Sequence, residues 1–151
     1  MTSRICIGCD HAAIDLKDTI HDYVKSKKIQ IDDMGTCDKE KSVDYPDFGI
    51  MVAKSVAQGN HDYGILICGT GLGMSMVANR FSGIRAALCN DLFSAKMCRQ
   101  HNNANILVMG GRIIGDVLAK EIVQVFLETP FDGGRHAKRL SKFDNLGTTI
   151  S

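Results

Sequence analysis

The stretch Ile65-Leu66-Ile67-Cys68-Gly69-Thr70-Gly71-Leu72-Gly73 decides the fold class of this chain. Its first four residues form a short apolar run, which is typical of a strand that is buried on both faces. Glycines at three alternate positions then predict a tight turn, and a helical segment follows over residues 74–81. A buried strand that leads through a turn into a helix is the repeating unit of a parallel sheet covered by helices.

The same alternation of apolar runs and helical stripes extends along the rest of the chain. Strands are predicted over residues 5–7, 29–34, 65–68, 84–89 and 106–109. Helices are predicted over residues 13–24, 46–58, 74–81, 91–101, 118–126 and about 135–145. This pattern predicts an α/β fold, a three-layer α/β/α sandwich with a Rossmann-like five-stranded parallel sheet. The order of the strands stays open, but ligands in such folds bind beyond the carboxyl ends of the strands.

The composition is that of a single globular domain. The chain has 151 residues, of which 44% are hydrophobic and 23% charged, so we expect one domain with one core over residues 1–151. The formal net charge is +1 and no long basic stripe occurs, which argues against a nucleic-acid partner. No 18-residue apolar stretch and no secretory signal are visible, so neither a membrane span nor export is expected. The predicted location is the cytoplasm, with the six cysteines reduced.

The glycine turn after Cys68 suits an anion, because glycine lets backbone amides approach a ligand closely. A dinucleotide site would need a third glycine at position 74, and Met74 breaks that fingerprint although Asp91 lies where a ribose-binding acid could sit. A P-loop would need Gly-Lys-Ser/Thr after the glycines, which the chain lacks. A Cys-x5-Arg phosphatase loop would need arginine at position 74, where the chain has methionine.

We therefore interpret Cys68 as a base. A thiol at a strand end before a helix favours its thiolate, which can remove a proton next to a carbonyl while loop amides hold the oxyanion.

The other cysteines have simpler explanations. The role of a small buried hydrophobic side chain is predicted for Cys6, Cys37, Cys89 and Cys98. A metal site is an alternative, because Cys6 and Cys9 form a C-x-x-C pair and Cys98 with His101 could add two ligands. However, residues three apart on a strand point to opposite faces. Zinc in the purified protein would support this alternative.

Polar residues also follow the first strand and the fourth helix. Asp10 and His11 fit either a ligand site or a helix cap with a surface histidine. His101 and Asn102 end the helix before the fifth strand, where a polar C-cap is the ordinary explanation.

Three arginines are candidates for binding an anion. Arg135 and Arg139 lie four residues apart and share a face of the predicted C-terminal helix, which suits a phosphate dianion. Arg112 lies just past the fifth strand. A solvated basic surface explains all three equally well.

Six motifs, in order along residues 4 to about 143, resemble the ribose-5-phosphate isomerase type B family. That family also contains galactose-6-phosphate and allose-6-phosphate isomerases. The motifs are Gly8-Cys9-Asp10-His11-Ala12, Asp44-Tyr45-Pro46, Ile67 to Gly73, Gly83-Ile84-Arg85-Ala86-Ala87, Arg99-Gln100-His101-Asn102-Asn103-Ala104-Asn105 and Gly133-Gly134-Arg135-His136. One branch of the family carries glutamate where this chain has Met74 and lacks the cysteine, so the chain is similar to the cysteine branch.

The resemblance implies a role for each candidate residue. Cys68 would take the C2 proton of the open-chain aldose and return it to C1. His101 would act as acid and base in opening the furanose ring, and Asp10 would bind hydroxyls near the ring oxygen. The remaining substrate-binding positions are Gly69, Thr70, Gly71, Leu72 and Gly73 for the enediolate, His11, Arg112, Arg135 and Arg139 for the phosphate, and Asn102 for a sugar oxygen.

The resemblance also implies an assembly and a reaction. The expected protein is a homodimer with active sites between subunits, with a dimer of dimers left open and the C-terminal helix contributing to the site or the dimer. The expected reaction interconverts D-ribose 5-phosphate and D-ribulose 5-phosphate in the pentose phosphate pathway, without cofactor or metal. A hexose-6-phosphate isomerase and a non-catalytic nucleotide-binding module are the alternatives. The mechanism requires the Cys68 sulfur to open into a cleft that also holds His101.

Overall fold

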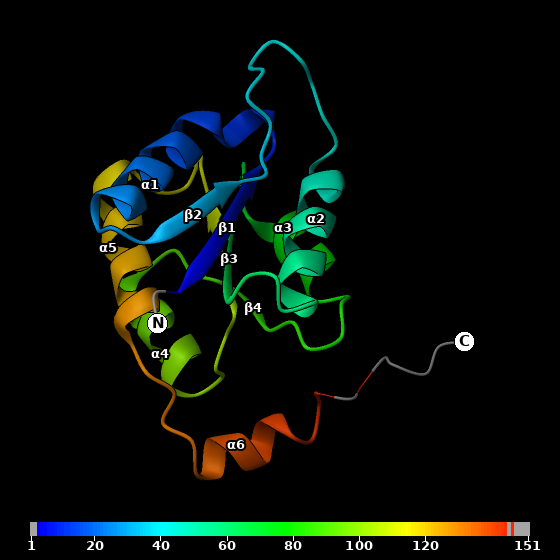
Figure 1. Cartoon of the computed structure of the whole chain (residues 1–151), viewed down its shortest axis with the longest axis vertical. Helices are drawn as coiled ribbons and strands as arrows, with labels where there is room; N and C mark the ends of the chain where they lie inside the picture. The colour runs from blue at the N-terminus through cyan, green and yellow to red at the C-terminus, as the bar shows by residue number, and fades with distance from the viewer. Residues whose placement is uncertain (1–2, 145, 147–151) are drawn as a thin grey trace.

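A fully parallel five-stranded sheet forms the centre of the molecule (Figure 1). The computed structural model describes residues 3–144 and 146. The strands are β1 (Arg4–Cys9), β2 (Gln30–Asp33), β3 (Tyr63–Cys68), β4 (Ala86–Leu88) and β5 (Ile106–Gly110). The helices are the 3-10 turn η1 (His11–Ala13), α1 (Ile14–Ser26), α2 (Tyr45–Ala57), α3 (Leu72–Ala78), α4 (Leu92–Gln100), α5 (Asp116–Glu128) and α6 (Arg135–Leu140). The predicted α/β fold is confirmed, and the strand order is β2-β1-β3-β5-β4.

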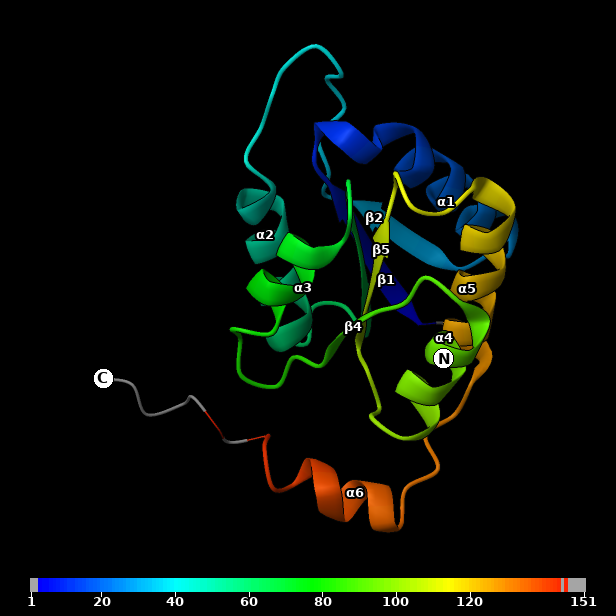
Figure 2. The same ribbon diagram turned by 180° about the vertical axis from the view of Figure 1, so that it is seen from behind.

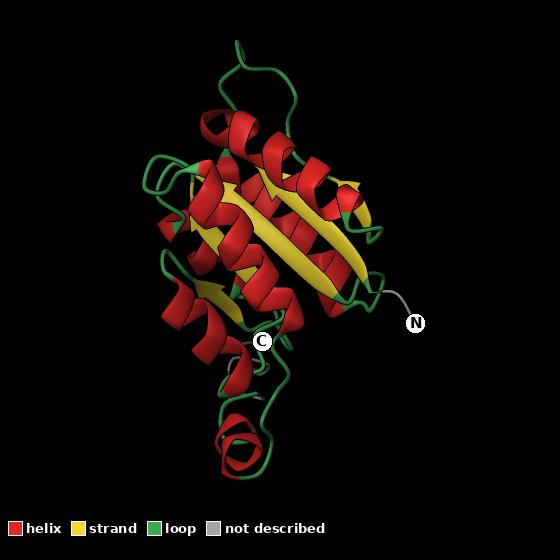
Figure 3. Ribbon diagram, turned by 90° about the vertical axis from the view of Figure 1, so that its left-hand side faces the viewer, coloured by secondary structure: helices red, strands yellow, loops and turns green. Residues whose placement is uncertain are grey.

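Helices cover both faces of the sheet and give the predicted three layers (Figure 3). One face carries α1, α4 and α5, and the other carries α2 and α3 (Figures 1 and 2). Alternate residues of β1 point to the two faces. Ile5 and Ile7 pack in the core below α1 and α5, whereas Cys6 packs with Val52 of α2. The sheet is therefore buried on both sides, which explains the continuous apolar runs of its strands.

The strands differ in burial according to their place in the sheet. At the centre, β3 is buried from Gly64 to Cys68, whereas only Ile31 of the edge strand β2 is buried. The other edge strand, β4, is half-buried throughout. The three inner strands end side by side, because Cys9 pairs with Ile67 and Cys68 pairs with Gly110. Residues that follow β1, β3 and β5 therefore share one edge of the sheet.

The helix α3 lies two to three residues ahead of its predicted span of 74–81. It begins at Leu72 because Gly71, with φ +80°, adopts the left-handed conformation that precedes the first turn. It ends at Ala78, where the side-chain amide of Asn79 ties the chain to β4. This amide donates to the carbonyl of Ala86 and accepts from the N–H of Ala86, both at 2.9 Å. The strand β4 is also shorter than predicted and spans Ala86–Leu88 in place of residues 84–89.

The C-terminal helix is shorter than its predicted span of about 135–145. It ends at Leu140, and the Ser141 hydroxyl donates to the carbonyl of Lys138 at 2.8 Å, a bond that competes with continued helix. Asn145, where the predicted helix ended, lies outside the described residues. The ribbon views show α6 apart from the three layers, below the end of the sheet at which α4 finishes (Figures 1 and 2). Over residues 3–144 and 146, no helix has both the length and the apolar character of a membrane span.

Candidate active site

Cys68 ends the central strand β3 and lies at the carboxyl edge of the sheet. Its side chain is 5% exposed, and its sulfur accepts a hydrogen bond from the backbone N–H of Gly71 at 3.2 Å. Cys68 is thus the one cysteine among the described residues to which a turn amide donates a hydrogen bond.

The backbone of the glycine turn is packed so tightly that side chains would not fit. A Cβ on Gly71 would lie 2.5 Å from Cδ1 of Leu88, and one on Gly73 would lie 2.5 Å from the ring of Tyr45. The next strand holds the turn from the other side, since the N–H of Gly111 donates to the carbonyl of Cys68 at 2.8 Å. Glycine is therefore required here for close approach, and the loop is fixed before any ligand arrives.

Asp10 and His11 lie at the same edge, directly after β1. Asp10 caps η1 and accepts from the N–H of Ala12 at 3.0 Å. Nδ1 of His11 accepts from the backbone N–H of Val43 at 3.2 Å, which leaves the Nε2 end of the ring free to face a ligand. The two polar residues after the first strand are therefore held by backbone groups, as is the sulfur of Cys68.

Arg112 lies over the glycine turn from the end of β5. Its backbone N–H donates to the carbonyl of Gly69 at 2.9 Å, and a Cβ on Gly69 would lie 3.5 Å from the guanidinium. The arginine therefore brings a positive charge to the turn. We call Asp10, His11, residues 68–73 and Arg112 the strand-end cluster.

The other predicted site residues lie at the opposite end of the molecule. His101 is the C-cap of α4, and its N–H donates to the carbonyl of Met97 at 2.8 Å. The chain then enters β5 at Ile106, whereas Cys68 pairs with Gly110 at the far end of that strand. Within one chain, Cys68 and His101 therefore lie near opposite edges of the sheet, and the shared cleft that the mechanism requires stays a prediction.

The two candidate phosphate-binding arginines lie with His101 at this end. Arg135 and Arg139 sit one turn apart on α6, both are exposed, and neither forms an ion pair with another described residue. The α6 segment is joined to α4, because the N–H of Asp132 donates to the carbonyl of Gln100 at 3.0 Å. We call His101, Asn102, Arg135 and Arg139 the helix-end cluster.

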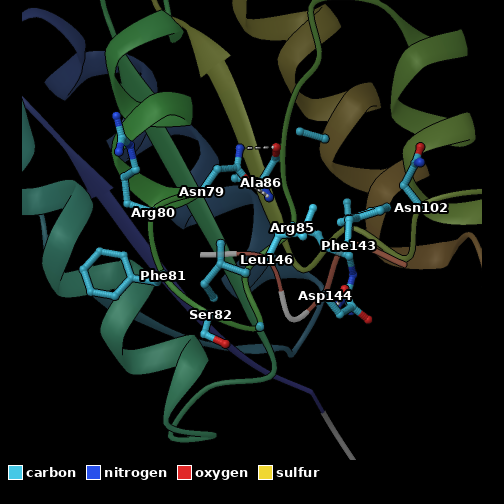
Figure 4. A pocket seen from close by; sticks show the side chains of 14 residues that line it. Asn79, Arg80, Phe81, Ser82, Arg85, Ala86, Asn102, Phe143, Asp144 and Leu146 are labelled. Atoms are coloured by element: carbon cyan, nitrogen blue, oxygen red, sulfur yellow. Dashed lines mark hydrogen bonds and ion pairs between the residues drawn. The ribbon is translucent and has the colours of Figure 1, made fainter. Parts of the chain in front are cut away.

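A cavity of about 570 Å³ lies beside the helix-end cluster, between the loop after α3 and the C-terminal segment. Figure 4 shows Asn102 on one side of it, with Arg85 and Phe143 between Asn102 and the loop. Asp144 pairs with the guanidinium of Arg85 at 3.3 Å. Cys68 of the same chain does not line this cavity.

The remaining cysteines have surroundings that differ from those of Cys68. Cys6, Cys89 and Cys98 are buried, as predicted, but Cys37 is exposed, and that prediction was wrong because Cys37 lies in the loop between β2 and α2. Burial raises the pKa of Cys6 to about 12. The hydrogen bond from Cys89 to the sulfur of Cys98, at 3.8 Å, raises the pKa of Cys89, and burial adds to the effect.

The alternative metal site at the C-x-x-C pair does not assemble. Cys6 and Cys9 belong to the cores on opposite faces of the sheet. Burial raises the pKa of Cys9 to about 12, as it does for Cys6, so neither sulfur is a ready metal ligand. Cys98 donates to the carbonyl of Ala95 within its own helix, at 3.2 Å.

Comparison with known proteins identifies the family of the chain. Residues 5–143 match the sequence model of the ribose/galactose isomerase family. The chain belongs to this family. A ribose 5-phosphate isomerase structure from Thermotoga maritima is similar, with 51% identity, a TM-score of 0.93 and coverage of 97% of this chain and 100% of that one.

Two further members of the ribose/galactose isomerase family are similar over nearly the whole length. Ribose-5-phosphate isomerase B of Escherichia coli is 44% identical over 137 residues, which cover 91% of each chain. Ribose-5-phosphate isomerase B of Mycoplasma genitalium, solved with bound ribulose 5-phosphate, is 38% identical with a TM-score of 0.94, and each chain is covered to 99%.

Some features of this family member had no signal in the sequence that we could use. The loop between β2 and α2 carries Val43, whose backbone N–H orients His11. Tyr45 packs against Gly73 of the glycine turn. His136 lies within a recognised motif but received no role, and its ring stacks on that of His101 at 4.3 Å between centroids. These contacts join residues far apart in sequence, so spacing alone could not predict them.

Proposed function

We propose that this protein is a ribose-5-phosphate isomerase that interconverts D-ribose 5-phosphate and D-ribulose 5-phosphate through an enediolate. The observation that carries the proposal is the Cys68 sulfur at the end of the central strand, with the N–H of Gly71 directed at it. Membership of the ribose/galactose isomerase family and the likeness to ribose-5-phosphate isomerases give the substrate class.

The reaction needs one base beside a row of amides. The Cys68 thiolate removes the proton from C2 of the open-chain aldose, and the electron pair forms the C1–C2 double bond of the enediolate as the C1 oxygen becomes negative. A proton passes from the C2 hydroxyl to the C1 oxygen, which moves the negative charge to the C2 oxygen. The thiol then returns its proton to C1, and a ketone forms at C2. The amides of residues 69–73 and the Thr70 hydroxyl stabilise the oxyanion.

The remaining residues bind and open the sugar. His101 exchanges protons with the ring oxygen and the anomeric hydroxyl, so that the furanose opens to the aldehyde. Asp10 binds hydroxyls near the ring oxygen, and Asn102 binds a further sugar oxygen. The phosphate is held by His11, Arg112, Arg135 and Arg139. Guanidinium groups suit this role because they bind phosphate oxygens through paired hydrogen bonds.

These roles require two copies of the chain. The strand-end and helix-end clusters lie at opposite ends of the sheet in one copy, so the proposed active site combines the first cluster of one subunit with the second cluster of its partner. A twofold dimer would form two such sites at once. The exposed arginines of α6 fit this arrangement, since they form no ion pair with another described residue and could reach a neighbouring subunit. A dimer of dimers would retain the same pair of sites.

The proposed cellular setting is the pentose phosphate pathway in the cytoplasm. All six cysteines are free thiols, including the buried pair Cys89 and Cys98, whose sulfurs lie 3.8 Å apart. Free thiols are typical of a reducing compartment.

A turnover assay on the purified protein tests the proposal. Ribose 5-phosphate, allose 6-phosphate and galactose 6-phosphate are compared by kcat/KM under the same conditions. We expect ribose 5-phosphate to be the preferred substrate. A higher kcat/KM for either hexose phosphate would favour the six-carbon alternative, and nucleotide binding without turnover of any sugar phosphate would favour a non-catalytic module.

A further inference from the structure

Three side chains with metal-binding atoms meet where α4 and α6 approach each other. They are His101, Asp132 and His136, and one candidate ligand atom from each lies within 4.8 Å of the others. His101 is half-buried, Asp132 is exposed and His136 is buried, so the group opens to solvent on one side. The segments that carry them are joined by the hydrogen bond from Asp132 to Gln100.

The ligand atoms of this group are not used by the fold. Within residues 3–144 and 146, none of the three side chains forms a hydrogen bond or an ion pair. The two imidazoles contact each other by stacking, with centroids 4.3 Å apart and planes at 8°. A buried polar side chain such as His136 normally has a hydrogen-bond partner in the protein or in ordered water. Two imidazole nitrogens and a carboxylate that lack them remain free to bind an ion.

We propose that His101, Asp132 and His136 form a binding site for a divalent transition metal of the zinc type. Zinc binds imidazole nitrogen and carboxylate oxygen at about 2.0–2.2 Å, and three protein ligands leave a position open. Binding requires the two rings to tilt out of their parallel stack, because the metal lies in the plane of each coordinating ring. Asp132 can move with the rings, because it is exposed and is followed by the glycines 133 and 134, which both have positive φ.

The charges beside the site decide which ligand matters most. Arg135 and Arg139 flank His136 on α6 and repel a cation, and Asp132 is the carboxylate that offsets them. The site is therefore expected to depend strongly on Asp132.

The consequence for activity rests on the proposed function. If His101 opens the sugar ring, a metal bound to its imidazole removes the acid and base from that step. The ion would also lie beside Arg135 and Arg139 in the cleft where the sugar phosphate binds. Zinc is then an inhibitor that competes with the substrate, and its binding to the protein does not depend on turnover.

Metal binding is tested directly by titrating full-length Cys68→Ala protein with cobalt(II) and zinc, which removes the catalytic thiol as a competing ligand. We expect one ion per chain, with a cobalt spectrum of nitrogen and oxygen ligands and no thiolate band. Asp132→Asn and His136→Asn should each weaken binding by about tenfold or more, since even partners outside the first ligand sphere are worth 10–100-fold. Asp22→Asn, which removes a surface carboxylate beside His21, is the matched control and should bind as before.

The activity measurement separates this inference from the proposed function. Zinc should inhibit the wild type by raising KM, whereas Asp132→Asn should turn over normally without zinc and tolerate about tenfold more of it. Absence of turnover with every sugar phosphate would refute the proposed function and leave the cobalt titration as it stands. Absence of metal binding, or binding equally tight in Asp132→Asn and His136→Asn, would overturn the metal site.

Discussion

The strand-end and helix-end clusters are built in different ways although both hold candidate site residues. Backbone hydrogen bonds fix the first: Gly71 donates to Cys68, Val43 to His11 and Ala12 to Asp10. The second is carried by the end of one helix and by the six residues of α6, which stands apart from the layers in Figure 2.

The difference fits the proposed division of labour between two subunits. The proton transfer needs a base and amides held in fixed positions, and the carboxyl edge of a parallel sheet provides them. Binding the phosphate and opening the ring can be supplied by an exposed element that meets the sheet of a neighbour.

Replacing the base should have the largest effect. Cys68→Ala is expected to lower kcat by at least about 100-fold, because a positioned general base contributes 10²–10⁴-fold. Its fold and oligomeric state should stay intact, as judged by circular dichroism and size-exclusion chromatography. Cys37→Ala is the matched control, since it removes an exposed thiol from a loop. Near-normal turnover in Cys68→Ala would refute the base assignment.

Adding one methyl group to the glycine turn should have the next largest effect. Gly71→Ala places a Cβ on a residue with left-handed backbone conformation, which lowers the free energy of unfolding by about 1–2 kcal/mol. The Cβ also crowds Leu88 and the backbone of Met109, which lowers it by about a further 1–3 kcal/mol. Turnover should fall because the amide directed at Cys68 moves. Gly59→Ala provides the comparison: its φ is +74°, but nothing lies within 4 Å of the added Cβ.

The two variants are compared by chemical denaturation and by kcat. In Gly59→Ala the free energy of unfolding should fall only by the cost of the left-handed backbone, about 1–2 kcal/mol, and turnover should stay normal. Equal losses of stability in both variants would show that the turn is not held by close packing.

Removing an arginine from α6 should have the smallest effect. Arg135→Ala and Arg139→Ala are each expected to raise KM by about tenfold or more, since a hydrogen bond to a charged group is worth about 1.5–3 kcal/mol. Thermal stability should not change, because both side chains are exposed and make no ion pair with described residues. Lys138→Ala on the same helix should leave KM unchanged. A fall in kcat alone would exclude a role in phosphate binding.

Most of the fold could be predicted because each element has a local signal. The apolar run before the glycine turn became β3, and Pro46 correctly placed the start of α2, whose first residue is Tyr45. The ends of α3 and α6 were misplaced, because the tie from Asn79 to β4 and the hydroxyl of Ser141 are interactions that hydrophobic periodicity does not contain. The polar composition of β2 was an unused indication that it lies at an edge.

The candidate site was predictable only in part. Residues directly after β1, β3 and β5 gather at one edge, as parallel strands require, so the positions of Cys68 and Arg112 followed from the fold class. The separation of Cys68 from His101 within one chain was not predicted, because it depends on which end of α4 carries the histidine. The stacking of His101 on His136 joins segments about 35 residues apart and left no pattern in the sequence.

Mixing two inactive variants tests the shared active site most directly. Cys68→Ala and His101→Ala proteins are each purified, mixed in equal amounts, exchanged into mixed dimers and assayed with ribose 5-phosphate. In a twofold dimer with shared sites, every mixed dimer contains one site with both residues intact, so about a quarter of the wild-type activity should return. If the mixture stays as inactive as its components while mass spectrometry detects mixed dimers, Cys68 and His101 do not act across the subunit interface.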